Sequence, residues 1–149
     1  MSSKEIVFFS GLPRSGSTVL QTILNQHSDI YATPTSPLLD LLIENQNAWK
    51  TNKSVIANPP PFEQLTNVTR AIIESFWKHI DKPIILDKNR GWMKNIKSAE
   101  ILFEREVKTI ITTRDLPSIM ASWLKLIHKD NNNIKIDQVI RKKVLNLYF

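Results

Sequence analysis

The sequence predicts an α/β domain, a three-layer structure in which helices cover both faces of a parallel sheet. Apolar or β-branched runs at residues 5–10, 83–86 and 107–113 alternate with stretches of helical spacing, which is the pattern of such a sheet. The first run passes through a loop of small residues directly into a helix. This P-loop-type strand–loop–helix arrangement is one that binds phosphate.

The elements of the first half follow in chain order. A helix is expected over residues 17–27, and Ser36 and Pro37 open a second helical stretch, LLDLLIENQNAW. Residues 50–64 are polar and carry three consecutive prolines, which predicts a loop. A third helix is expected over residues 62–80, where apolar residues recur near helical spacing.

The second half repeats the alternation. The buried strand PIIL ends at Asp87, and a helix is expected over residues 97–105. The next strand, VKTIITT, is rich in β-branched residues. Asp115 can cap the helix that follows it, with Pro117 in the first turn. The tail, residues 134–149, is expected to be helical.

Length and composition bound the possible functions. We interpret residues 1–149 as a single domain, although three strands make a small sheet and leave open whether the domain is complete. The net charge of +6 suits a polyanionic ligand. No apolar run approaches the ~20 residues of a membrane span, and the N-terminal apolar run is too short for a signal peptide. With no cysteine, disulfides and thiolate metal sites are excluded, and we expect a cytoplasmic protein.

The loop at residues 11–18 is close to the Walker A pattern but departs from it at one position. Gly11 and Gly16 are in place, and Thr18 fills the Ser/Thr position, but Ser17 stands where that pattern requires lysine. Arg14 supplies the full positive charge from inside the loop, and its planar fork suits phosphate or sulfate oxygens. The loop is therefore expected to hold such an anion with a displaced cation.

The environment of this loop adds further donors. Backbone N–H groups of a Gly-rich turn form an anion nest, and the helix N-terminus adds roughly half a positive charge. The hydroxyls of Ser15, Ser17 and Thr18 lie at the same mouth.

The segment PRSGST after an apolar strand resembles the 5′-phosphosulfate loop of the sulfotransferases that use 3′-phosphoadenosine 5′-phosphosulfate (PAPS). The following residues, LQTILNQHSDIYATPTSPL, resemble the same region of the PRSGST-type members. The resemblance implies a sulfotransferase-like fold, PAPS as the co-substrate, and a binding loop formed by Pro13, Arg14, Ser15, Gly16, Ser17 and Thr18.

A second motif strengthens the resemblance. The segment TTRDLPSIMAS matches the 3′-phosphate motif of this family, an arginine at a strand end and a serine eight residues later. Arg114 leaves the carboxyl end of a strand, where ligands bind in open α/β sheets. Ser118 and Ser122 share one helix face. The resemblance implies that Arg114 and Ser122 bind the 3′-phosphate.

A third polar group follows the middle strand. In this family the corresponding strand end lies near the transferring group, so Lys88 is a candidate to contact the sulfuryl oxygens. Asp87 is a candidate general base for the acceptor hydroxyl. The predicted catalytic residues are Arg14, Asp87 and Lys88, and Arg90 could bind anions of the acceptor or of PAPS. Tyrosylprotein sulfotransferases, one branch of this family, carry a Glu just after the first helix. The corresponding residues here, 32–36, contain no Glu.

The implied reaction is in-line transfer of a sulfuryl group from PAPS to a hydroxyl or amine acceptor that the sequence does not identify. The resemblance implies no metal, and His27, His79 and His128 lack the spacing of metal ligands. Four tryptophans could line an acceptor pocket. Basic and aromatic residues are not clustered as in nucleic-acid-binding modules, so no nucleic-acid partner is expected.

Two other interpretations remain open. The first is a P-loop phosphotransferase or nucleotide kinase, with the loop at residues 11–18 on the nucleotide and Asp87 on Mg²⁺. Ser17 opposes it, because that fold needs lysine there, and Arg114 and Ser122 have no role in it. The second is an inactive, truncated remnant that binds PAPS, since family catalytic domains are usually longer.

Overall fold

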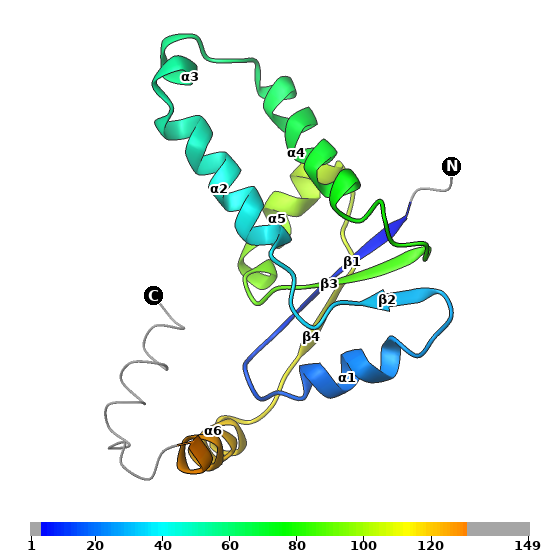
Figure 1. The fold of residues 1–149 in the computed structure, drawn as a ribbon. Coiled ribbons are helices and arrows are strands. Elements are labelled where there is room, and N and C mark those ends of the chain that lie inside the picture. Colours follow the sequence, from blue (N-terminus) through cyan, green and yellow to red (C-terminus); the bar gives the residue numbers. More distant parts are fainter. Residues whose placement is uncertain (1–3, 131–149) are drawn as a thin grey trace.

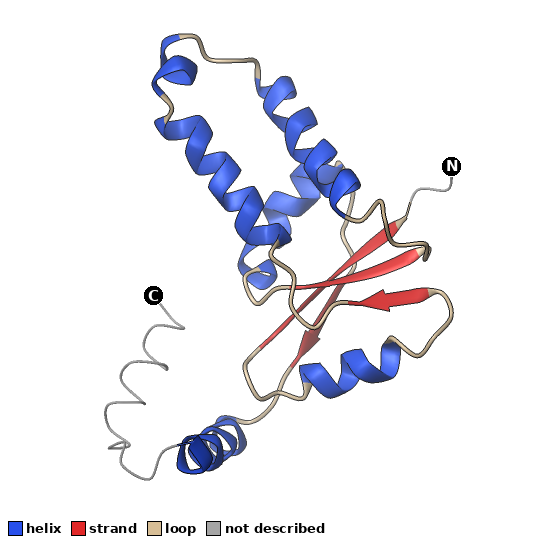
Figure 2. Ribbon diagram, viewed as in Figure 1, coloured by secondary structure: helices blue, strands red, loops and turns tan. Residues whose placement is uncertain are grey.

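The computed structural model describes residues 4–130, and Figures 1 and 2 show their fold. Four strands form one all-parallel sheet in the order β2-β3-β1-β4. Their bounds are β1 (Glu5–Gly11), β2 (Ile30–Ala32), β3 (Ile84–Lys88) and β4 (Thr109–Thr112). The α/β prediction with a parallel sheet is confirmed. The helix expected over residues 134–149 lies outside the described residues.

Strand β2 has no counterpart in the prediction from sequence. It holds only three residues, too few to show an alternating pattern, and it occupies an edge of the sheet beside β3. Register rather than composition makes it a strand, because Ile30 pairs with Ile84 and Ala32 with Leu86. The sheet therefore has four strands where three were expected.

Six helices are described: α1 (Ser17–Leu24), α2 (Leu38–Thr51), α3 (Lys53–Ala57), α4 (Phe62–Phe76), α5 (Trp92–Phe103) and α6 (Leu116–Asp130). The short helix α3 lies inside the predicted loop, and the Asn52 side chain caps it by accepting from the N–H groups of Ser54 and Val55. Helix α5 begins five residues earlier than predicted, because Asn89 Oδ1 accepts from Gly91 N and starts the helical turn.

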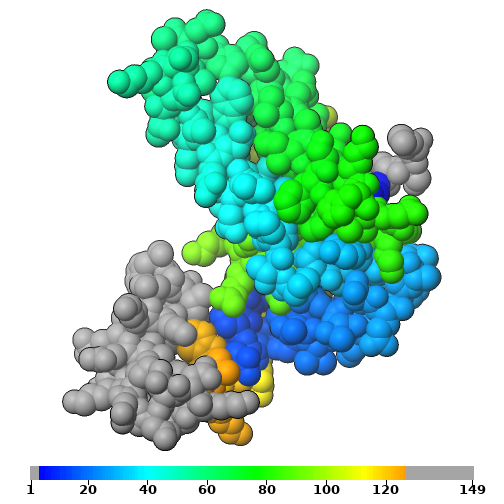
Figure 3. Space-filling view, viewed as in Figure 1, coloured from blue at the N-terminus to red at the C-terminus, as the bar shows by residue number. Residues whose placement is uncertain are grey.

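The two faces of the sheet carry different helices. Helices α2, α4 and α5 cover one face, and α1 lies on the other (Figure 1). Side chains alternate along β1 accordingly: Phe8 packs in the larger core cluster, with its ring centroid 4.0 Å from that of Trp92, while Val7 packs in a smaller cluster with Leu86. Burying a side chain such as Phe8 contributes about 1.5–3 kcal/mol. The space-filling view shows α2, α3 and α4 as a lobe beyond the sheet (Figure 3).

The strand order creates a switch point at the carboxyl end of β1. From β1 the chain crosses to β2 at one edge of the sheet, whereas β4 pairs with β1 on the other side. Open α/β sheets bind ligands outside the carboxyl ends at such a point. The loop of residues 11–18 therefore lies where a ligand is expected. No helix within residues 4–130 is long and apolar enough to cross a membrane.

Candidate active site

Three residues at the end of β1 and in the loop that follows it have positive φ angles. Gly11 has a φ of 152°, and a Cβ there would lie 2.7 Å from the carbonyl oxygen of Thr112, so a side chain would clash. Gly16 has a φ of 90°, with no atom within 4 Å of its Cβ position. Arg14 has a φ of 64°, which costs about 1–2 kcal/mol for a residue with a side chain. Such strain is typical of functional loops, and the space beyond Gly16 leaves room for an anion.

Ser15 fixes the loop to the end of β4. Its hydroxyl donates to the carbonyl oxygen of Leu12 at 2.6 Å and lies 2.7 Å from the Thr112 hydroxyl. The Ser15 N–H also bonds to Leu12 O, which closes a tight turn. This serine therefore shapes the loop, a role that adds to the ligand contact expected for it.

The structure brings the two predicted phosphate motifs together. Arg14 Nε donates to Ser122 Oγ at 2.9 Å, and Arg114 Nη1 donates to the backbone oxygen of Arg14 at 3.1 Å. These partners are 108 and 100 residues apart in sequence. Both arginine side chains are exposed, so two cationic groups and a hydroxyl meet at the carboxyl edge of β1 and β4.

Two helix starts complete this edge. Ser17 and Thr18 are the first two residues of α1, whose first N–H groups have no helical acceptor and can face an anion. Pro13 precedes the arginine in the loop and is half-buried. Asp115 caps α6, as predicted, by accepting from Ser118 N at 2.8 Å. This hydrogen bond, followed by lesser contributions that include the nearby charge of Arg114, lowers the pKa of the Asp115 carboxyl.

Lys88 ends β3 on the same face as α1. Its ammonium donates to Gln21 Oε1 at 3.0 Å, and Arg90 lies near enough to repel it. Burial lowers the pKa of Lys88, and the charge of Arg90 lowers it further. An anion beside these two cations would favour the charged form of Lys88, so the ammonium can contact the oxygens of such an anion.

Gln21 and Thr33 are site residues that the sequence prediction did not include. Gln21 is the buried residue of α1, and its amide donates to the carbonyl oxygen of Thr33 while its oxygen accepts from Lys88. The Thr33 hydroxyl in turn accepts from Lys88 N at 3.0 Å. The sequence offers one signal for Gln21: it follows Ser17 by four residues, so the two side chains share one helix face.

Asp87 lies in a different environment from the one expected. Its carboxyl group has no exposed surface: Oδ1 accepts from Trp92 Nε1 at 2.8 Å, and Oδ2 accepts from Ser36 Oγ at 2.8 Å and Trp77 Nε1 at 3.1 Å. Burial raises the pKa of Asp87, and the three donors oppose that rise. A general base must reach the proton of its substrate. The structure therefore does not support Asp87 as the base for an acceptor.

Asn89 holds the carboxylate of Asp40 beside the loop that follows β3. Its side-chain amide donates to Ser36 O at 3.0 Å and to Asp40 Oδ2 at 3.1 Å, so the exposed Asp40 is tied to the loop after Lys88. Sequence analysis did not single out Asp40, which lies in the first turn of α2. Within residues 4–130, no three or more His, Cys, Asp or Glu side chains form a group that could hold a metal ion.

The family comparison agrees with this geometry. A family model described as "Sulfotransferase family" matches residues 7–148, which is nearly the whole chain. A search of curated proteins gives no match. The match spans the loop, the end of β3 and the Arg114–Ser122 motif, and it favours sulfuryl transfer over the kinase interpretation. The chain belongs to the sulfotransferase family.

Proposed function

We propose that this sulfotransferase takes its sulfuryl group from PAPS and transfers it to a hydroxyl or amine acceptor. In the proposal, the loop from Pro13 to Thr18 binds the 5′-phosphosulfate, and Arg114 with Ser122 binds the 3′-phosphate. One observation carries it: Arg14 Nε donates to Ser122 Oγ, so the residues for the two ends of one ligand are adjacent. A donor with two anionic ends explains why both motifs meet.

The residues fit such a ligand chemically. The hydrogen bond to Ser122 uses only Nε of Arg14, so its two Nη groups can still meet an anion in the fork geometry that suits phosphate and sulfate. Gly16 leaves open space beside the loop amides. Ser17 stands in place of the Walker lysine, and Arg14 supplies the charge that this lysine would bring.

The proposed chemistry is a displacement at sulfur. The acceptor oxygen or nitrogen forms a bond to sulfur, and its proton passes to water. The bond from sulfur to the bridging oxygen breaks, and adenosine 3′,5′-bisphosphate leaves with the electron pair of that bond. Negative charge grows on that bridging oxygen. Arg14 and the loop amides stabilise it, and Lys88, held by Gln21, neutralises the sulfuryl oxygens during transfer. No metal is needed to balance these charges.

Calorimetric titration tests the donor. Adenosine 3′,5′-bisphosphate should bind without metal and more tightly than ADP or ATP with Mg²⁺. Arg114→Ala should weaken adenosine 3′,5′-bisphosphate by about 10–100-fold, the value of a charge-assisted hydrogen bond, and leave ADP unchanged. Arg14→Ala should weaken both ligands, because both carry a phosphate at the 5′ end.

The matched control is Arg105→Ala, which removes an exposed arginine ahead of β4, at the amino end of the strands. It should leave both affinities unchanged. Equal losses for the two ligands in Arg114→Ala would overturn the 3′-phosphate assignment. Preference for ATP with Mg²⁺ would favour the kinase interpretation. A protein that binds adenosine 3′,5′-bisphosphate but transfers no sulfuryl group would indicate the inactive remnant, and a folded protein that binds no nucleotide would overturn the proposed donor.

We also propose that residues 1–149 act as one domain and that the protein works in the cytoplasm. The four strands share one sheet, and the family model spans residues 7–148, which support a single unit. The absence of cysteine suits a reducing compartment. Limited proteolysis that yields one stable fragment, and fractionation of cells that make the tagged protein, would test the two statements.

A further inference from the structure

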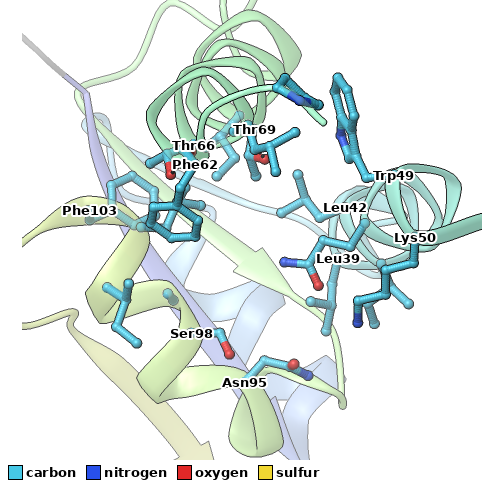
Figure 4. A pocket seen from close by; sticks show the side chains of 18 of the residues that line it. Leu39, Leu42, Trp49, Lys50, Phe62, Thr66, Thr69, Asn95, Ser98 and Phe103 are labelled. Carbon is cyan, nitrogen blue, oxygen red and sulfur yellow. Dashed lines mark hydrogen bonds between the residues drawn. The ribbon is translucent and has the colours of Figure 1, made fainter. Parts of the chain in front are cut away.

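A large cavity lies among α2, α3, α4 and α5, on the face of the sheet opposite α1 (Figure 4). Its volume is about 640 Å³, within the roughly 300–1,000 Å³ of small-molecule sites. It plays no part in the binding of PAPS proposed above. Trp49 and Trp92, two of the tryptophans considered for an acceptor pocket, line it.

The wall of this cavity is apolar and nearly uncharged. Lys50 is the one charged residue among those that line it. Several polar side chains of the wall are already hydrogen-bonded within the chain: Thr66 donates to Phe62 O at 3.0 Å, and Thr69 donates to Leu65 O at 2.9 Å. A largely apolar wall with few charged groups favours a neutral apolar ligand over a charged one, because a buried charge needs a partner.

Large apolar side chains at the cavity remain exposed. Phe62 is 74 % exposed, Ile56 63 % and Ile101 66 %, and all three line the cavity. Figure 4 shows labelled side chains from α2, α4 and α5 facing a common space. The protein thus keeps an apolar space open to solvent, which is costly unless a ligand fills it.

One end of the cavity lies next to Gly91, in the loop that follows Lys88. Asn95, which lines the cavity, donates to Gly91 O at 2.8 Å, and a Cβ on Gly91 would lie 2.6 Å from Leu39 Cδ2. The cavity and Lys88 are on opposite faces of the sheet, but Gly91 follows Lys88 by three residues at the carboxyl end of β3. The Gly91 end of the cavity is therefore the part nearest to the proposed sulfuryl contact.

We propose that this cavity binds the apolar body of the acceptor, and that the acceptor is a neutral alcohol or phenol whose hydroxyl lies at the Gly91 end. This inference rests on the proposed transfer from PAPS, and it names the acceptor class. The apolar wall disfavours an acidic sugar or an acidic peptide as the occupant, because a lone lysine could pair with only one of their several charges.

Binding is tested with N-phenyl-1-naphthylamine, an uncharged fluorophore that brightens in apolar surroundings. It should bind the wild type and be displaced by alkan-1-ols, with affinity rising about fourfold per methylene, the effect of burying one CH₂. Ser98→Trp and Thr66→Trp place an indole into the cavity from opposite walls and should each abolish binding. Ser75→Trp, the same change at an exposed α4 residue outside the cavity, should not.

Transfer from PAPS to the same alcohols is measured next. The ratio kcat/KM should rise with chain length in the wild type and in Ser75→Trp, and the rise should vanish in Ser98→Trp. Arg14→Ala should lose transfer and keep fluorophore binding. Loss of nucleotide binding with intact displacement by alcohols would overturn only the proposed donor.

Three results of the binding and transfer assays would overturn the acceptor proposal. The first is a folded protein that binds no fluorophore, and the second is equal losses in Ser98→Trp and Ser75→Trp. The third is a cavity that binds alcohols while kcat/KM shows no dependence on chain length. A protein that is dimeric by light scattering, and that Ser98→Trp makes monomeric without fluorophore binding in either form, would assign the cavity to a second copy instead.

Discussion

Asp87 and Lys88 are neighbours on β3, yet the two faces of the sheet give them opposite environments. Asp87 is fully buried beneath α2, α4 and α5 and accepts hydrogen bonds from two indoles and a serine. Lys88 is half-buried on the α1 face, where it meets Gln21. The difference shows that a polar pair at a strand end is divided by the pleat, because successive side chains point to opposite faces.

The faces also differ in what their polar groups do. On the α1 face, Lys88 contacts Gln21, one turn into the helix that follows the loop carrying Arg14. On the other face, Asp87 holds together Ser36 before α2, Trp77 after α4 and Trp92 at the start of α5. The first group can serve the transfer chemistry, and the second fixes the helices that form the apolar cavity.

The largest effect is expected from Lys88→Ala. Removing a cation that stabilises charge in the transition state should lower kcat by about 10²–10³-fold. The midpoint of urea unfolding should fall modestly, because the buried Gln21 Oε1 loses its hydrogen-bond donor. Lys94→Ala, which removes an exposed lysine early in α5, is the matched control and should keep full activity. Equal kcat values for the two variants would remove Lys88 from the transfer step.

Asp87→Asn should act on stability instead. An amide can accept on one side only, so one of the Trp77 and Trp92 N–H groups loses its acceptor in the core. An orphaned buried donor costs about 1–3 kcal/mol, which urea unfolding at neutral pH can measure. The kcat of the folded protein should stay within about threefold. A hundredfold fall in kcat at unchanged stability would restore Asp87 as the base.

The pH dependence of stability sharpens the contrast between the faces. Because burial raises the pKa of Asp87, the folded state holds this proton more tightly than the unfolded state does. The free energy of unfolding of the wild type should therefore fall, relative to Asp87→Asn, as pH rises from the ordinary carboxyl pKa of 3.8 through the raised pKa. A relative gain over that interval would show that the three donors outweigh burial.

The smallest effect concerns the strained loop. Arg14→Ala and Arg14→Gly both remove the guanidinium and should both lose transfer. Glycine adopts a φ of 64° without a steric cost, so Arg14→Gly should be more stable than Arg14→Ala by up to about 1 kcal/mol. Urea unfolding of the pair measures this difference. Higher stability of the alanine variant would argue against strain at this position.

The local sequence pattern predicted much of the fold and of the phosphate-binding loop. The apolar strand, the two loop glycines and the following helix predicted the phosphate loop, because turn geometry and helix starts depend on neighbouring residues. The same holds for the Asp115 cap, and the resemblance at residues 13–18 and 112–122 led to the family. What local pattern missed was short or context-dependent, such as the three-residue strand β2 and the early start of α5.

Only the tertiary structure decided which distant residues meet. The contacts of Arg14 with Ser122, of Lys88 with Gln21 and of Asp87 with its two indoles join segments through the sheet order. Sequence places Asp87 and Lys88 side by side, but which face is covered by three helices depends on packing. The role of each side chain follows from that burial, and burial is a property of the assembled fold.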